Sequence, residues 1–235
     1  TSQRFQILLD FLNKEKILNF FHAELDNLIF NFDDLDNKLD NIGKGIFVPK
    51  DSYNRAIASF LYCNRTECLN EIIDIYKPPN NVRNDMEALG IYSNISKYFF
   101  SLPTESFLRN SEKWKIIKPE TTKGIFDAAA IGQFCLGIDP RNNRYKPTYN
   151  LFINENVNVD INNLKFLPDQ KIFNIFFPKL KKTYKIYNLH VHSKNIDKAY
   201  ELLRKRKIYK SLKERKPVIV NHSHKTITGF FVKLI

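Results

Sequence analysis

The chain has 235 residues, of which 43% are hydrophobic and only seven are glycine. This composition excludes collagen-like and low-complexity proteins and allows one large core or two modest ones. The formal net charge is +12, with most of the excess positive charge in the segments 179–185 and 202–216, so an anionic partner or a solvated basic face explains the pattern equally well.

Membrane and secretion signals are absent from the sequence pattern. No stretch approaches the about 20 consecutive apolar residues of a membrane-spanning helix, and the first residues lack the basic start and cleavage site of a secretory signal. The cysteines Cys63, Cys68 and Cys135 form no CxxC pair, which favours reduced thiols over a disulfide framework or a zinc knuckle. The sequence therefore predicts a soluble, cytoplasmic protein.

Helical and strand patterns alternate along the chain. Apolar residues at helical spacing predict a helix that starts near residue 4 and leads directly into a strand at 20–30. Further strands are predicted at 45–49 and 57–63, helices at 67–76, 84–99, 126–136 and 198–212, and mainly strands and loops at 146–194. This alternation indicates an α/β layer structure. We expect one main domain over 1–210, followed by a C-terminal β-hairpin or extension over 211–235 with its turn at 222–225.

The predicted strand FFHAELDNLIF, residues 20–30, places His22, Glu24 and Asp26 at alternate positions, on one face of a strand. Two neighbouring carboxylates that are partly buried repel each other, and a cation between them is the simplest compensation. The alternative is a strand end in solvent, with Asp26 and Asn27 as ordinary turn residues.

A second predicted strand, within KIYNLHVHSK, repeats this design. Ile186, Asn188, His190 and His192 share one face if the strand is continuous. A pair of histidines in this spacing is either a set of metal ligands or a hydrogen-bonded pair without a metal.

The chain resembles a family of GT-A-type glycosyltransferases from bacterial and large-virus surface-glycan gene clusters. The resemblance covers roughly residues 4–200 and rests on the order of six segments: RFQILLDFL, FFHAELDNLIF, NDMEAL, FDAAAIGQFCLGIDPRN, FINE and YNLHVHSK. It implies an α/β, GT-A-like fold, in which a mixed sheet is flanked by helices. It also implies an enzyme that transfers a sugar from a nucleotide-sugar donor to a glycan acceptor in surface polysaccharide or glycoconjugate synthesis.

The resemblance also implies a metal site. Enzymes of this fold hold Mn²⁺ or Mg²⁺ against the donor diphosphate with a DxD-like motif, and here the motif is ExD, formed by Glu24 and Asp26. Many of them add a C-terminal histidine followed by a lysine that meets the phosphates. We assign His192 to the metal because it lies nearer the predicted strand end, although His190 fits the motif as well.

The remaining site residues follow from the same resemblance. His190, Lys194 and Asn27 are assigned to the nucleotide cosubstrate. Asp127 and Asp85 are assigned as catalytic acids on the acceptor side, where they would orient or deprotonate the acceptor hydroxyl. Both residues stand at predicted helix starts, so each is equally well explained as a helix cap or a first-turn charge.

The chain departs from the GT-A pattern at its start. GT-A folds begin with a βα unit that binds the nucleoside, and here no β-rich segment precedes the first helix. Either that unit is missing from this chain, or the base and ribose are held differently. The donor nucleotide therefore stays unassigned.

Two other functions fit parts of the sequence. A metal-dependent hydrolase would use His22, Glu24, Asp26, His190 and His192 around zinc or a metal pair.

A nucleic-acid-binding module would use the basic stretch 179–216, with Tyr184, Tyr187, Tyr200 and Tyr209 as stacking partners. The helix at its C-terminal end is also a plain amphipathic helix. In a glycan-assembly enzyme this helix would rest on the inner face of an anionic membrane, and nucleic acid would not be a partner.

Overall fold

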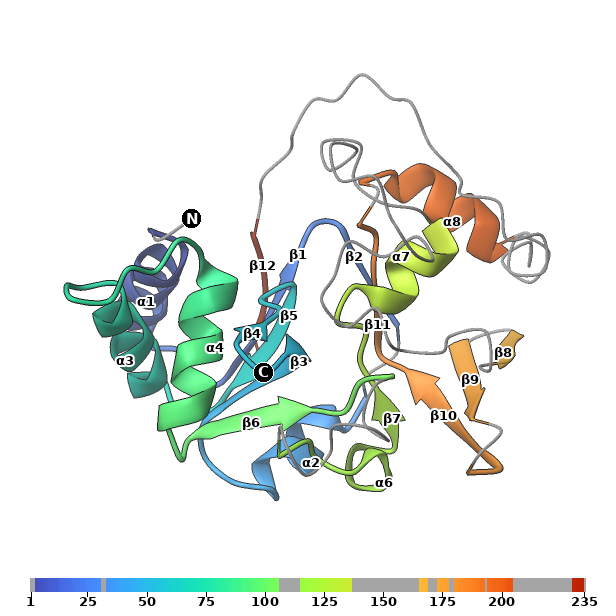
Figure 1. Cartoon of the computed structure of the whole chain (residues 1–235), viewed down its shortest axis with the longest axis horizontal. Coiled ribbons are helices and arrows are strands. Elements are labelled where there is room, and N and C mark those ends of the chain that lie inside the picture. The colour runs from blue at the N-terminus through green and yellow to red at the C-terminus, as the bar shows by residue number, and fades with distance from the viewer. Residues whose placement is uncertain are drawn as a thin grey trace.

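The computed structural model is an α/β structure with mixed sheets flanked by helices (Figure 1). The residues that it describes are 3–30, 33–105, 115–136, 165–168, 173–177, 180–192, 194–204 and 230–234. None of the helices in these ranges is long and apolar enough to cross a membrane.

The largest sheet has the strand order β12-β1-β5-β3-β4, and β6 pairs with β3 off this path. Its strands are β1 (Phe20–Glu24), β3 (Ile46–Ser52), β4 (Arg55–Ala56), β5 (Phe60–Cys63), β6 (Phe99–Leu102) and β12 (Phe230–Leu234). Strands β1 and β3 both run antiparallel to β5, and β6 runs parallel to β3. The carboxyl ends of β1, β3 and β6 therefore point to the same edge of the sheet.

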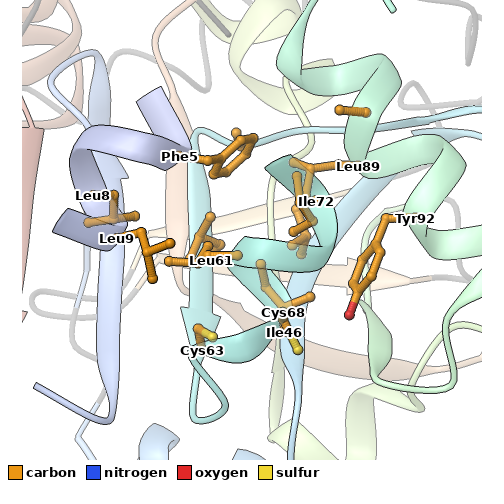
Figure 2. Close-up of a cluster of buried hydrophobic side chains, with 14 of the residues drawn as sticks. Phe5, Leu8, Leu9, Ile46, Leu61, Cys63, Cys68, Ile72, Leu89 and Tyr92 are labelled. Carbon is orange, nitrogen blue, oxygen red and sulfur yellow. The ribbon is translucent and has the colours of Figure 1, made fainter. Parts of the chain in front are cut away.

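Three helices cover one face of this sheet: α1 (Gln3–Glu15), α3 (Glu67–Ile75) and α4 (Asp85–Ile95). Phe5, Leu8 and Leu9 of α1 pack against Leu61 of β5 and Ile72 of α3, as Figure 2 shows. The apolar spacing of α1 thus forms a buried stripe. Helix α4 begins at a cap in which the Asn84 side chain accepts a hydrogen bond from the backbone N–H of Glu87, at 3.0 Å.

A second region carries two smaller sheets. One has the order β7-β10-β9-β8 and the other pairs β11 with β2. Their strands are β2 (Asn27–Ile29), β7 (Gly124–Ile125), β8 (Lys165–Pro168), β9 (Phe173–Phe177), β10 (Lys182–Ile186) and β11 (Asn188–His190). Helices α7 (Ala130–Leu136) and α8 (Ile196–Arg204) lie in this region, and α2 (Leu35–Asp40) and α6 (Pro119–Thr122) lie near β7 (Figure 1).

Tyr187 carries the chain from the four-stranded sheet to the two-stranded sheet. Its backbone N–H donates to Ile125 at 2.9 Å, and its carbonyl accepts from Phe30 at 2.9 Å. The ring stacks on Phe126 with centroids 4.8 Å apart, and its hydroxyl donates to the carbonyl of Thr122. These contacts anchor the residue to two segments of the chain, 122–126 and the residue after β2.

The helices expected at 67–76 and near residue 4 are confirmed. The helix expected at 84–99 is shorter, because it ends at Ile95 and Phe99 begins β6. The helix expected at 126–136 starts only at Ala130, because Ala129 has a left-handed φ of 76°.

Both strands expected to carry the site are interrupted. The strand expected at 20–30 breaks at a turn over Leu25 and Asp26, and its halves join different sheets. The strand expected around Tyr187 also divides between two sheets. Strict alternation across each predicted strand is therefore wrong. The domain boundary expected at residue 210 and the turn expected at 222–225 lie outside the described residues, and Phe230–Leu234 pairs with β1.

Candidate metal centre

The candidate site lies at the carboxyl edge of the main sheet. In α/β sheets ligands bind beyond the carboxyl ends of the strands, where loops converge and backbone groups are free of the ladder. Here the turn after β1 brings Asp26 to the edge, and β11 approaches through its antiparallel pairing with β2. Val191 N–H donates to the carbonyl of Asp26 at 2.7 Å, which fixes the end of β11 against that turn.

Glu24, Asp26 and His190 form a group with metal-ligand geometry. One ligand atom from each of the three lies within 4.8 Å of the others, and no other group of this kind is present among the described residues. Glu24 and Asp26 are half-buried, whereas His190 is buried. The arrangement offers carboxylate oxygens and one imidazole nitrogen to a single point.

Positive groups surround Asp26. Its carboxylate lies 3.3 Å from Nε2 of His190 and accepts a hydrogen bond from Nζ of Lys194. Burial acts to raise the pKa of Asp26, but the hydrogen bonds and charges of His190 and Lys194 outweigh it and hold the pKa well below its usual range. Burial acts to lower the pKa of His190, and the hydrogen bond and charge of Asp26 reverse this, so that its pKa lies above the ordinary value.

Arg4 links Glu24 to Asp85. Its guanidinium lies 2.5 Å from Glu24 and 2.9 Å from Asp85, and all three side chains are less than a quarter exposed. Asp85, the first residue of α4, also accepts a hydrogen bond from Met86 N–H at 3.0 Å. Arg4 thus joins Asp85 to the metal-competent group.

His192 and His22 lie outside the metal-competent group. His192 follows β11 in a turn, and its backbone N–H donates to the carbonyl of His190 at 2.8 Å. Its ring centroid lies 6.0 Å from that of His190. The histidine that joins the metal-competent group is therefore His190 and not His192, because β11 ends at His190 and His192 lies in the turn beyond it.

His22 is fully buried in β1, between Leu61 of β5 and Val232 of β12. Burial, followed by the charge of Arg4, lowers its pKa to about 3. His22 is therefore a neutral side chain of the sheet interior at neutral pH, and the structure does not bring it to the candidate site.

Asn27 belongs to a buried amide network. Its side-chain N–H donates to the carbonyl of Ser59 at 2.7 Å, and its side-chain oxygen accepts from Asn188 at 3.0 Å. Asn188 also exchanges hydrogen bonds with the backbone of Asp127, at 3.0 and 3.2 Å. Because both ends of the Asn27 amide are bonded inside the protein, we assign it to holding β2 against β11 and β5 rather than to the nucleotide.

Asp127 is a fully buried helix cap. Its carboxylate accepts hydrogen bonds from the backbone N–H groups of Ile131, Gly132 and His190, at 2.9, 2.8 and 2.9 Å. Burial raises its pKa to about 6, although these hydrogen bonds and the charge of His190 act in the opposite direction. The geometry favours the cap interpretation over direct contact with an acceptor. Asp127 ties α7 to the backbone of His190.

Gly132 makes this junction close. A Cβ atom at this position would lie 1.7 Å from the carbonyl oxygen of His190 and 2.9 Å from the carboxylate of Asp127. Helix α7 and strand β11 therefore approach to a distance that excludes a side chain at this position.

Two residues that shape the site were not predicted from the sequence. Arg4 gives no signal, because it looks like an ordinary charged residue near a helix start. Asn188 had a weak signal in its position on the same predicted face as His190. Both act through partners far along the chain, which local patterns do not reveal.

The aromatic stacking partners of the nucleic-acid alternative are only partly described. Tyr187 is fully buried, and Tyr184 is 6% exposed with its hydroxyl bonded to Glu120. Neither ring is available to stack on a base. Tyr209 lies outside the described residues, as does all of the basic stretch beyond Arg204.

Comparison with known proteins gives no relative. No family model, no curated protein and no solved structure matches this chain.

Proposed function

We propose that this protein is a metal-dependent glycosyltransferase that transfers a sugar from a nucleotide-sugar donor to a glycan acceptor in surface polysaccharide or glycoconjugate synthesis. The observation that carries the proposal is the convergence of Glu24, Asp26 and His190 at the carboxyl edge of the main sheet, beside Lys194. A GT-A-like identity of the α/β fold belongs to this proposal. So does a cytoplasmic location, peripheral to an anionic membrane.

The donor set fits Mn²⁺ or Mg²⁺. Carboxylate oxygens are the ligands that these hard cations prefer, and imidazole suits Mn²⁺ better than Mg²⁺. Nε2 of His190 faces Asp26, whereas its Nδ1 is buried without a hydrogen-bond partner, so Nε2 is the nitrogen placed to bind. A bound cation would supply electrostatic stabilisation of the departing diphosphate.

Charge balance supports a cationic ligand. Three carboxylates, on Glu24, Asp26 and Asp85, face two permanent cations, Arg4 and Lys194. One negative charge is thus left for His190 or for a bound ion to balance. Lys194 is 36% exposed and is the cation best placed to turn toward a phosphate.

The two predicted catalytic acids take supporting roles in this proposal. Asp127 positions the backbone of His190, and Asp85 holds the guanidinium that faces Glu24. Each acts through another residue of the candidate site.

A thermal-shift screen tests the proposal. The protein is heated with the diphosphates of uridine, guanosine, cytidine and thymidine, each with Mn²⁺ and with EDTA. A ligand that binds only the folded state raises the melting temperature, so stabilisation by one nucleotide that requires Mn²⁺ is expected. The same screen is run on Asp26→Asn, which removes one carboxylate of the candidate site. Asp74→Asn is its matched control, because Asp74 is an exposed carboxylate on α3. The absence of any nucleotide effect in the wild type would contradict the proposal.

The same screen separates the hydrolase alternative. Stabilisation by a divalent ion alone, with no further effect of any nucleotide, would favour a metal-dependent hydrolase built on Glu24, Asp26 and His190.

A further inference from the structure

A second acidic position lies at the same edge of the main sheet. Strand β6 ends at Leu102, and the carbonyl of Pro103 accepts a hydrogen bond from Phe126 N–H at 2.7 Å. Thr104 then forms a parallel bridge with Phe126. Because neighbouring positions advance together in a parallel pairing, Glu105 follows beside Asp127.

The carboxyl group of Glu105 is buried and has no partner on another described residue. The residue is 4% exposed, and the hydrogen bond that favours its charged form comes from its own backbone N–H. A buried polar group in this state carries a desolvation penalty of about 1–3 kcal/mol. Native proteins rarely keep such a group unless it has a use, so a buried carboxyl without a partner on another described residue points to a ligand.

Glu105 is suited to a neutral ligand. Burial, followed by the negative charges of Asp127 and Asp51, raises its pKa to about 8. A protonated carboxyl group offers one donor and one acceptor, which matches a hydroxyl group. Glu105 also belongs to no group of metal-competent side chains among the described residues, so a second cation site is not indicated.

We propose that the carboxyl group of Glu105 binds the hydroxyl groups of a neutral sugar unit at the carboxyl edge of β6. This inference rests on the proposed glycosyl transfer and identifies the sugar as part of the acceptor. The edge of the sheet would then carry two subsites. The metal-competent group after β1 would bind the donor diphosphate, and Glu105 after β6 would bind the acceptor hydroxyls.

The test uses the full chain with Glu105→Leu and Glu105→Gln, and Glu67→Leu as the control at an exposed glutamate. Saturation-transfer NMR measures binding of methyl glycosides of glucose, galactose, mannose and N-acetylglucosamine. We expect at least one glycoside to bind the wild type and the control, to lose its signal with Glu105→Leu, and to keep a weaker signal with Glu105→Gln, which still donates and accepts.

Melting temperature provides a second readout. Removal of a buried carboxyl group that has no partner on another described residue should raise the melting temperature of Glu105→Leu. A lower melting temperature would mean that Glu105 has a structural partner and would overturn the inference, as would the failure of every glycoside to bind the wild type.

Nucleotide binding separates this inference from the proposed function. If Mn²⁺-dependent nucleotide stabilisation is present in the wild type and in Glu105→Leu while no glycoside binds, only the inference fails. If no nucleotide binds, the proposed function fails on its own measurement.

Discussion

The turn after β1 and the segment after β6 both place carboxyl groups at one edge of the main sheet, yet the two groups have opposite electrostatic surroundings. Asp26 meets His190 and Lys194, which hold its pKa well below the usual range. Glu105 meets no cation among the described residues, and burial beside Asp127 and Asp51 raises its pKa to about 8. The neighbours of a carboxyl group, more than its position on the sheet, therefore decide which ligand it can take.

Gly132→Ala should have the largest effect on stability, because it disturbs the close contact between α7 and β11, which involves both His190 and Asp127. The added Cβ would collide with the carbonyl of His190 at 1.7 Å and disturb Asp127. We expect the free energy of unfolding to fall by about 3 kcal/mol, the upper end of typical overpacking costs. Urea denaturation measures the change. An unchanged midpoint would show that α7 and β11 separate without strain.

Asp26→Asn should weaken Mn²⁺ binding by roughly a hundredfold, since it removes a charged ligand from the group, and changing a residue that only contacts a metal ligand already costs about 10–100-fold. Isothermal titration calorimetry measures the affinity, and Asp74→Asn should leave it unchanged. Equal Mn²⁺ affinity in Asp26→Asn and the wild type would remove Asp26 from the site.

Glu105→Gln should change how stability depends on pH. Between the ordinary pKa of 4.5 and the folded pKa of about 8, the folded state keeps a proton that the unfolded chain has released. The contribution of Glu105 to the free energy of unfolding should therefore fall as pH rises through this window. The decline of the wild type relative to Glu105→Gln measures that contribution, because both proteins share the contributions of Asp127 and His22. Urea denaturation of both proteins at about pH 5 and about pH 8 measures this difference in the free energy of unfolding.

Asp26 should act in the opposite direction. Its depressed pKa gives stability that is present above the ordinary pKa of 3.8 and lost as pH falls below it. Stabilities of the wild type and Glu105→Gln that change in parallel between the ordinary and folded pKa of Glu105 would contradict this contrast between the two regions.

Arg4→Gln should have the smallest effect, a loss of about 1–2 kcal/mol in the free energy of unfolding, because its two ion pairs are only partly buried. Lys77→Gln is the matched control, since its ion pair with Asp74 is more than half exposed on both sides and should contribute less than about 0.5 kcal/mol. Equal losses in the two variants would show that Arg4 does not bridge Glu24 and Asp85 in solution.

Local patterns predicted part of this structure. The apolar spacing of Phe5, Leu8, Leu9 and Leu12 predicted α1 because a helix buries every third or fourth residue wherever it packs. The alternation of strands and helices likewise predicted the α/β class. Glu24 and Asp26 were predicted as a pair because they are close in sequence.

The rest of the site depends on contacts that are distant in sequence. The choice between His190 and His192 depends on where β11 ends, and its last pair with β2 joins His190 to Asn27. Arg4 meets Asp85, and Glu105 lies beside Asp127, across long stretches of chain. Each of these partners satisfies a charge or a burial constraint that exists only once the sheets are assembled.

The bonds of Tyr187 also have a consequence for hydrogen exchange. A single peptide segment links the four-stranded and two-stranded sheets through its N–H, its carbonyl and its ring. Local opening of either sheet must therefore break bonds that hold the other. Amide protons in β10 and β11 should therefore show the same free energy of opening in hydrogen exchange. The two sheets share no hydrogen-bond ladder, yet they would unfold as one cooperative unit.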